Sequence, residues 1–406
     1  MPIDAEGMPN AMTQDVPTEP SRGPLDGLVV ADMSRVLAGP YCSMLLGDMG
    51  ATVVKVEGPA GDDTRTWVPP EKDGIATYYL SIGRNKRSVV LDFRDPGDQA
   101  LAAELLRRAD IAIENFRPGS LRKFGLDYET AAELNPGLVY LSITGFGTAE
   151  GAWLPGYDLI VQAVSGLMSL TGDPDGPAYR AGISVFDVMA GLHGLIGVLA
   201  ALRQRSETGR GQHVEVNLLS SAMSGLVNQT AAYTAAGVVP TRMGNAHPSL
   251  FPYETMPTAD RDMIIAAGND RQFRSLCEVL GIPDVSDDPS FLSNADRTRN
   301  REQLRPLLVD ALAEWKADDL FLALNKAGVP CGPINTIGEG VELAESLGLA
   351  PRAELGADGR AVTLVRNPIG FSDARLRYDL PPPELGEHSD EIKAWLRGAD
   401  GQRGAV

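Results

Sequence analysis

Segments typical of β-strands and of α-helices alternate along the N-terminal third of the chain, and this alternation most constrains the fold. Runs rich in β-branched residues predict strands, and apolar residues at helical spacing predict helices. The predicted strands are 28–34, 52–57, 88–93, 110–116 and 137–147, and the helices include 40–50 and 95–109. A helix between two strands returns the chain to the same edge, so the strands pair in parallel. We therefore expect an α/β fold whose parallel sheet is covered on both faces and binds ligands beyond the carboxyl ends of its strands.

The second half of the chain indicates a smaller domain. The composition changes at 238–257, which is rich in proline, and a charged, mostly helical segment follows at 269–327. Further helices are predicted at 157–172 and 220–237, and a further strand at 211–219. We expect a disordered tail at 1–23, a large domain from 24–225 and 335–406, and a small α+β domain with its linkers at 226–334.

The net charge of the chain excludes some classes of binding partner. The net charge is −18, whereas nonspecific binding to nucleic acid or to an anionic membrane surface needs clustered cations. The apolar run at 190–202 is too short to cross a bilayer. We therefore expect no nucleic acid and no membrane among the partners, and any phosphorylated ligand needs cations gathered locally.

Cysteine and histidine usage gives two further expectations. The three cysteines are far apart and odd in number, which favours a reducing compartment, and we expect a cytoplasmic protein. The four histidines are scattered, so no metal site is predicted.

Several familiar phosphate-binding motifs are missing. The loop after the first strand reads RVLAGP and lacks the three glycines that let a backbone approach a pyrophosphate. Glu57, at the end of the second strand, is therefore interpreted as a solvated strand end. Cations do gather near predicted strand ends: Arg84, Lys86, Arg87, Arg94, Arg117, Arg122 and Lys123. They form either a phosphate site or a solvated basic surface, and the residue pattern leaves both open.

Asp187 stands alone in an apolar stretch, AGISVFDVMAGLHG, at the start of a predicted helix. Aspartate is a preferred helix N-cap, and this is its commoner role. A carboxylate among small residues also has room to attack a bulky acyl group and form a covalent intermediate. Both roles are open from the residues alone.

Nine ordered motifs resemble those of the family III CoA-transferases, a family that also contains α-methylacyl-CoA racemases. They are LDGLVVADMSRVLAGPYCSMLLGDMGATVVKVE, GDDTRTW, NKRSVVLD, ENFRPG, PGYDLIVQA, SLTGDPDGP, FDVMAGLHG, GVPCGPI and LGEHSDEI. Each motif alone is weak, but their order and spacing are specific. The resemblance covers about residues 24–395.

The resemblance implies a Rossmann-like large domain, a small domain and two chains interlocked as a homodimer. It implies an acyl-CoA and a small carboxylic acid as substrates, with no permanently bound cofactor. Asp187 would be the nucleophile, forming an aspartyl-CoA thioester. By motif, the CoA contacts fall on Leu37, Ala38, Leu91, Arg94, Asn115, Phe116, Lys123, Phe124 and Tyr157.

The chain departs from some members of that family. Leu37 replaces a glutamine, Gly58 an arginine and Pro155 a lysine, and the glycine run of the formyl-CoA members is reduced to Gly244. These departures argue against oxalate or formate as the substrate.

Two other functions remain open. A racemase on the same fold needs two proton-transfer groups, and Tyr157 stands where racemases carry histidine. His193 is one candidate substitute, but its place in the predicted helix favours packing in the core. A non-catalytic acyl-CoA-binding protein is the second alternative, against which the retained Asp187 argues.

Overall fold

The computed structural model describes residues 23–357 and 360–398, and its chain divides into two compact units. The first unit comprises the described parts of 1–144, 191–216 and 352–406, and the second comprises 145–190 and 217–351. Residues 1–22 of the predicted tail lie outside the described residues. Both units are assembled from separate stretches of the chain, and the domain limits expected from the sequence stay a prediction.

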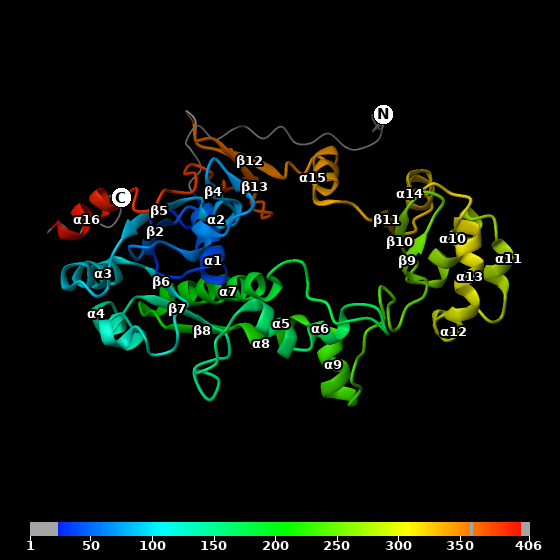
Figure 1. Ribbon diagram of the computed structural model, residues 1–406, viewed down its shortest axis with the longest axis horizontal. Helices are drawn as coiled ribbons and strands as arrows, with labels where there is room; N and C mark the ends of the chain where they lie inside the picture. Colours follow the sequence, from blue (N-terminus) through cyan, green and yellow to red (C-terminus); the bar gives the residue numbers. More distant parts are fainter. Residues whose placement is uncertain (1–22, 358–359, 399–406) are drawn as a thin grey trace. The chain divides into compact units, whose positions relative to one another are not determined.

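A six-stranded sheet forms the centre of the first unit (Figure 1). In spatial order its strands are β5 (Lys86–Val90), β2 (Thr52–Glu57), β1 (Val29–Asp32), β6 (Ile111–Glu114), β7 (Val139–Thr144) and β8 (His213–Asn217). Neighbours from β5 to β7 pair in parallel. Numbered along the chain this is the order 3-2-1-4-5-6 of a doubly wound sheet. The predicted α/β fold with a parallel sheet is therefore confirmed.

The two faces of this sheet are covered by different helices. On one face Val29 and Ala31 pack in a buried core with α3 (Pro96–Arg108), α4 (Tyr128–Leu134) and α16 (Ser389–Arg397). On the other face, α1 (Ala38–Asp48) and the long helix α7 (Val185–Thr208) lie against Ile113 and Leu141 (Figure 1). Successive side chains of a strand point to opposite faces, so nearly every residue of β1 and β6 is apolar.

The termini of α3 illustrate how local sequence sets these helices. Asp95 accepts a hydrogen bond from the backbone N–H of Asp98, Pro96 occupies the first turn, and two arginines end the helix. An aspartate cap, an early proline and late cations each favour the helix at that end. The prediction of a helix at 95–109 is confirmed for this reason.

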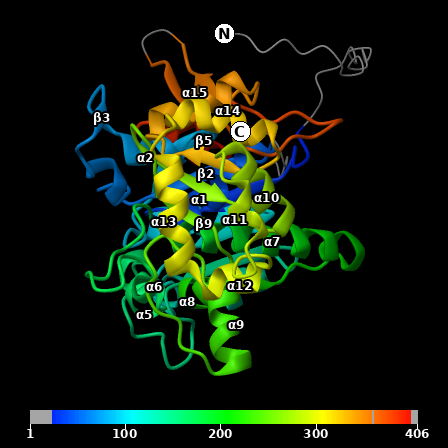
Figure 2. The same cartoon turned by 90° about the vertical axis from the view of Figure 1, so that its right-hand side faces the viewer.

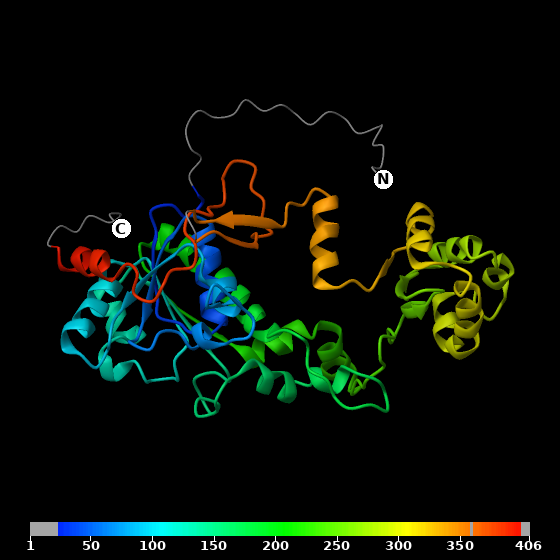
Figure 3. The ribbon, with the colours of Figure 1, turned by 45° about the horizontal axis from the view of Figure 1, so that its top comes forward.

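Smaller elements complete the first unit (Figure 3). They are η1 (Asp63–Thr66), β3 (Glu71–Lys72), β4 (Ile75–Ala76), α2 (Thr77–Gly83), η2 (Arg122–Phe124), β12 (Arg352–Leu355) and β13 (Val362–Val365). The C-terminal helix α16 contacts α3 and the edge strand β5. Arg108 of α3 donates to the carbonyl oxygens of Trp395, Leu396 and Gly398, and so satisfies the end of α16.

Helix α7 belongs to both units, since its residues up to Ala190 fall in the second unit and those from Gly191 on in the first. Among the described residues it is the one helix long and apolar enough, by length and composition, to cross a membrane. The apolar run at 190–202, on which the sequence-based expectation rested, is shorter than this helix. A core helix has the same properties, and Gly194 packs so closely on the sheet that an added Cβ would lie 2.8 Å from Leu141.

The second unit contains helices and a three-stranded antiparallel sheet, β11 (Cys331–Pro333), β10 (Asp262–Ala266) and β9 (Tyr253–Pro257). Its helices are α5 (Asp158–Val164), α6 (Leu167–Leu170), α8 (Leu218–Gly225), α9 (Val227–Ala236), α10 (Asp270–Val279), α11 (Pro283–Asp287), α12 (Asn294–Arg299), α13 (Arg301–Leu312), α14 (Ala317–Lys326) and α15 (Ile337–Ser346) (Figure 2). β9, β10, α10, α13 and α14 share one apolar core.

Candidate active site

A cavity of about 420 Å³ lies at the carboxyl ends of β1, β2, β5 and β6 in the first unit. Its walls come from Met33 and Arg35 after β1, from 55–63 around the end of β2, from 91–94 after β5, and from two phenylalanines, Phe116 and Phe124. It lies where the strand order of a doubly wound sheet reverses, which is the usual ligand position in such sheets.

The cavity gathers four of the residues predicted to contact coenzyme A: Leu91, Arg94, Phe116 and Phe124. Phe124 packs against Phe93, with ring centroids 5.8 Å apart, and the Arg35 guanidinium lies 5.4 Å from the centre of the Phe116 ring. Flat apolar faces beside a guanidinium suit a planar base. Sequence reasoning missed Arg35 and Phe93, although Arg35 follows one predicted strand and Phe93 is the last residue of another.

Three cations line the cavity, Arg35, Lys55 and Arg94, and each has a carboxylate partner. Arg94 pairs with Asp92 at 2.8 Å, and Arg35 lies 3.8 Å from Asp63. The exposed Lys123 ammonium lies 4.7 Å from the centre of the Phe124 ring. A phosphate group binding here therefore competes with Asp92 and Asp63 for the two arginines.

Asn115, Leu37 and Ala38 shape the loops around β1. The Asn115 side chain accepts from the backbone N–H of Arg35 at 2.8 Å and donates to the Arg35 carbonyl at 2.7 Å. Leu37 and Ala38 are buried where α1 begins. An added Cβ at Gly191 of α7 would lie 2.6 Å from the Ala38 carbonyl oxygen, so this backbone lies directly on α7.

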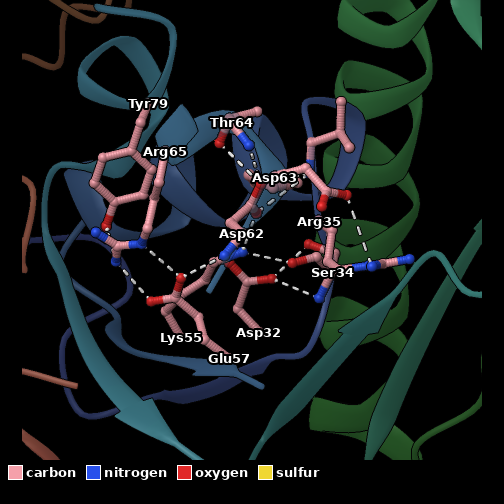
Figure 4. Close-up of polar contacts among 12 residues, drawn as sticks. Asp32, Ser34, Arg35, Lys55, Glu57, Asp62, Asp63, Thr64, Arg65 and Tyr79 are labelled. Atoms are coloured by element: carbon pink, nitrogen blue, oxygen red, sulfur yellow. Dashed lines mark hydrogen bonds and ion pairs between the residues drawn. The ribbon is translucent and has the colours of Figure 1, made fainter. Parts of the chain in front are cut away.

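A network of buried charges underlies the cavity (Figure 4). The Lys55 ammonium donates to Asp62 at 2.9 Å and to the carbonyl oxygen of Ser34. Burial would raise the pKa of Asp62, but Lys55 outweighs it and holds that pKa below its usual range. These bonds tie the loop after β2 to the loop after β1, so the cavity wall is held by fully buried ion pairs.

The interpretation of Glu57 as a solvated strand end is wrong. Its side chain is buried and accepts two bonds from Arg65, at 2.8 and 2.7 Å (Figure 4). It also accepts a bond from Ser88 at 2.6 Å. Burial opposes its ionisation, yet the Arg65 guanidinium keeps the pKa of Glu57 below its usual range.

Two cations of the predicted basic cluster have structural roles instead. Arg84 is buried against Asp48 through bonds of 2.8 and 2.7 Å, and Lys86 is buried 3.2 Å from Asp32. Burial lowers the pKa of Lys86 to about 8, although Asp32 opposes this. Neither residue lines the cavity. The expected cluster is therefore divided between the interior and the rim.

In the second unit, Asp187 is the third residue of α7. The Asp158 carboxylate, from α5, accepts bonds from the backbone N–H groups of Phe186 at 2.7 Å and of Asp187 at 3.2 Å. Burial, and then the negative charge of Asp158, raises the pKa of Asp187 to about 7. The N-terminal N–H groups of α7 are thus bonded by Asp158, while Asp187 stands inside the helix rather than at its cap position.

The remaining predicted contact, Tyr157, precedes α5 in the second unit, and its side chain is 60% exposed. His193 lies in α7, six residues beyond Asp187. Within 23–357 and 360–398, no group of three or more His, Cys, Asp or Glu side chains has an arrangement that holds a metal ion.

Comparison with known proteins assigns the chain to a family. Residues 25–389 match the family model of the CoA-transferase family III. The chain is 44% identical over 382 residues to a succinate–glutarate CoA-transferase of Agrobacterium fabrum, covering 92% of this chain and 96% of that protein. It is 39% identical to an acetyl-CoA:oxalate CoA-transferase of Acetobacter aceti, covering 94% and 98%.

Solved structures agree with this assignment. A CaiB/BaiF family protein from Brucella suis is 43% identical, with a TM-score of 0.83, and covers 92% of this chain and 100% of that one. A protein from Mycobacterium tuberculosis is 28% identical, also with a TM-score of 0.83, and covers 92% and 100%. The resemblance found in the sequence is confirmed. The chain belongs to CoA-transferase family III and is an enzyme that transfers coenzyme A from an acyl-CoA to a carboxylic acid.

Proposed function

We propose that Asp187 is the covalent nucleophile of this transfer. The observation that carries the proposal is a partly buried carboxyl group whose pKa is raised to about 7, at the start of a helix and bordered by small residues. Near neutral pH a large fraction is ionised, and the ionised form is more basic than an ordinary carboxylate. A more basic carboxylate attacks an acyl carbon more readily.

The reaction then proceeds in balanced steps. A carboxylate oxygen of Asp187 attacks the thioester carbonyl, the carbon–sulfur bond breaks, and an aspartyl–acyl anhydride and the CoA thiolate result. The thiolate attacks the aspartyl carbonyl, which releases the donor acid and leaves an aspartyl–CoA thioester. The acceptor carboxylate attacks that thioester, its carbon–sulfur bond breaks, and a second anhydride and the CoA thiolate result. The thiolate finally attacks the acceptor acyl carbon, which gives the new acyl-CoA and regenerates Asp187 without net proton transfer.

We infer that the cavity of the first unit binds the nucleotide of coenzyme A. Phe116 and Phe124 offer flat faces to the adenine, and Arg94 and Lys123 offer charges to the phosphates. Leu37, Ala38, Leu91 and Asn115 complete the contacts proposed in the first unit, and Tyr157 of the second unit stays a predicted contact. Coenzyme A enters as a substrate in this scheme, and no step uses a permanently bound group.

We propose short dicarboxylic acids as the exchanged substrates, with succinyl-CoA as the donor. The support is the naming of relatives: succinate–glutarate in Agrobacterium fabrum at 44% identity, and succinyl-CoA:glutarate in human at 37%. The departures at Leu37, Gly58 and Pro155 argue against oxalate, and a relative with 39% identity named an acetyl-CoA:oxalate CoA-transferase makes oxalate the acid to compare with glutarate.

One experiment tests both nucleophile and substrates. Succinyl-CoA is incubated with a panel of acids in deuterium oxide, and the products are read by mass spectrometry. We expect glutaryl-CoA to form without α-deuteration, and hydroxylamine to leave a hydroxamate on Asp187 alone. The Asp187→Asn variant should fold and bind coenzyme A but lose transfer by several orders of magnitude. Deuterium incorporation without transfer would instead identify a racemase.

We also infer that two chains interlock as a homodimer. Large apolar side chains stand exposed on the helices of a single chain, on α5, α7 and α9. They are Leu159, Ile160, Val164, Ile196, Val227 and Tyr233, each 47–67% exposed. Soluble monomers rarely expose so many large apolar side chains, so a second chain is the fitting cover.

A further inference from the structure

Two side chains of α5, Asp158 and Gln162, bind the segment that leads into α7. Gln162 is fully buried, and its amide oxygen accepts from the backbone N–H of Ala181 at 2.8 Å. Its amide nitrogen donates to the carbonyl oxygen of Ile183 at 3.1 Å and to the Asp158 carboxylate. Because the amide oxygen accepts one of these bonds and the amide nitrogen donates the other two, only one orientation of the amide makes all three.

Asp158 continues this set of bonds to the helix itself. One of its oxygens accepts from Gln162, and the other accepts from the N–H groups of Phe186 and Asp187. Asp158 is itself buried, so these bonds form away from water, where their direction is well defined. A chain of bonds thus runs from Gln162 through Asp158 to the backbone of Asp187.

We propose that Asp158, oriented by Gln162, is a positioning residue that fixes the Asp187 carboxyl group for attack on the thioester. The inference rests on the proposed role of Asp187 as the nucleophile. Asp158 acts in two ways. It fixes the backbone from which Asp187 projects, and its charge makes Asp187 harder to ionise and therefore more basic when ionised.

Asp158 is the charged neighbour that acts on Asp187. It is the one ionisable residue of α5, and α6 and α8 carry none. Met189 of α7 packs against Gly225 of α8, so α8 covers this part of α7 with uncharged residues. Arg180 donates to the carbonyl oxygen of Ala181, and His193 lies more than one turn further along α7.

The two actions of Asp158 are separable by substitution. Asp158→Asn keeps an acceptor for the helix N–H groups but removes the charge, and its amide nitrogen opposes the amide nitrogen of Gln162. Gln162→Ala keeps the charge but removes the orienting bonds. Asp287→Asn, an exposed carboxylate of α11 in the same unit, is the matched control for loss of one negative charge.

The experiment measures kcat/KM for transfer from pH 5.5 to 8.5, with coenzyme A binding and thermal stability measured in parallel. For Asp158→Asn we expect the acidic limb of the pH profile, where kcat/KM falls, to move to lower pH. We also expect kcat at pH 8 to fall about 10- to 100-fold. For Gln162→Ala we expect a similar fall in kcat with the limb unmoved. Coenzyme A binding should change in neither variant, and Asp287→Asn should match the unmodified enzyme.

A folded Asp158→Asn enzyme with unchanged kcat and an unmoved limb would overturn the inference. If that variant does not fold, Gln162→Ala decides, and an unchanged kcat there overturns it equally. The proposed nucleophile fails separately, through an active Asp187→Asn enzyme or a hydroxamate on another residue. An inactive Asp187→Asn enzyme beside unaffected Asp158 and Gln162 variants would remove only the positioning role.

Discussion

Asp187 lies in the first turn of a helix, where the helix dipole favours an ionised carboxylate, yet its pKa is raised. Burial and the neighbouring charge of Asp158 therefore outweigh the dipole. Two carboxylates of the first unit show the opposite outcome, since Lys55 and Arg65 hold the pKa values of Asp62 and Glu57 below their usual range despite burial. What separates the two groups is a cation in contact, which Asp62 and Glu57 have.

The raised pKa predicts a pH dependence of transfer. Only the ionised Asp187 attacks, so kcat/KM should be level above pH 8 and fall about tenfold for each pH unit below about 7. Initial rates in buffers of constant ionic strength measure this. A profile that stays flat down to pH 5 contradicts the nucleophile.

The raised pKa of Asp187 also predicts how the stability of the folded chain changes with pH. A folded-state pKa above the ordinary value of 3.8 means that Asp187 opposes folding once the pH exceeds that value, and does so fully above about 7. Asp187→Asn should therefore gain stability relative to the unmodified chain at pH 8 and show little difference near pH 4. Thermal unfolding at the two pH values compares them.

Lys123 and Arg122 form a matched pair of exposed cations for the proposed nucleotide site. Lys123 lies over the Phe124 ring at the cavity, whereas Arg122 faces Glu129 at 3.7 Å. Lys123→Ala should weaken coenzyme A binding by about 1–3 kcal/mol if it bonds a phosphate, and Arg122→Ala should change it little. Calorimetry at low salt measures both. Equal losses in the two variants would return Lys123 to a general surface charge.

At the scale of elements, helix ends were predictable where local residues set them. They were not predictable where a positive φ angle interrupts a helix. The predicted helices at 40–50 and 95–109 match α1 and α3 because glycine, aspartate and proline mark their ends. The single helices predicted at 157–172 and 220–237 are each divided. Gly166 and Val227 adopt positive φ angles of 97° and 40° there, which no apolar pattern reveals.

The site was predictable to the same limited extent. Residues at strand ends, such as Leu91 and Phe116, line the cavity because parallel strands end at one edge. The roles of Arg84, Lys86 and Glu57 were not predictable, since each depends on a partner from another element that only folding brings near. Charge at a strand end does not by itself distinguish a ligand site from an internal ion pair.

Two helical glycines give opposite predictions for the same substitution. Gly191→Ala places a Cβ 2.6 Å from the Ala38 carbonyl oxygen, so we expect a loss of about 1–3 kcal/mol although alanine favours helices. At Gly340 in α15 nothing lies within 4 Å of an added Cβ, so Gly340→Ala should stabilise by up to about 1 kcal/mol. Chemical denaturation of both variants measures this, and a stabilising Gly191→Ala contradicts the close packing.

At the scale of the whole molecule, the two units interleave along the sequence, since the second unit's 145–190 and 217–351 lie between stretches of the first. The proposed interlocked dimer follows this organisation. Interlocked chains cannot separate while folded, so dilution should leave one species of twice the 43.2 kDa chain mass. Light scattering during denaturation should find dimer loss coincident with unfolding. A stable folded monomer refutes the interlock.

The docking of α16 also has a consequence for biosynthesis. A ribosome makes β5 and α3 early, but their contacts with α16 join residues about 300 positions apart, as in the bond from Lys393 to Asp98. The whole second unit is translated in between. The nascent first unit therefore leaves the edge strand β5 and part of its apolar core uncovered for most of translation, which is the interval in which chaperone binding or aggregation competes with folding.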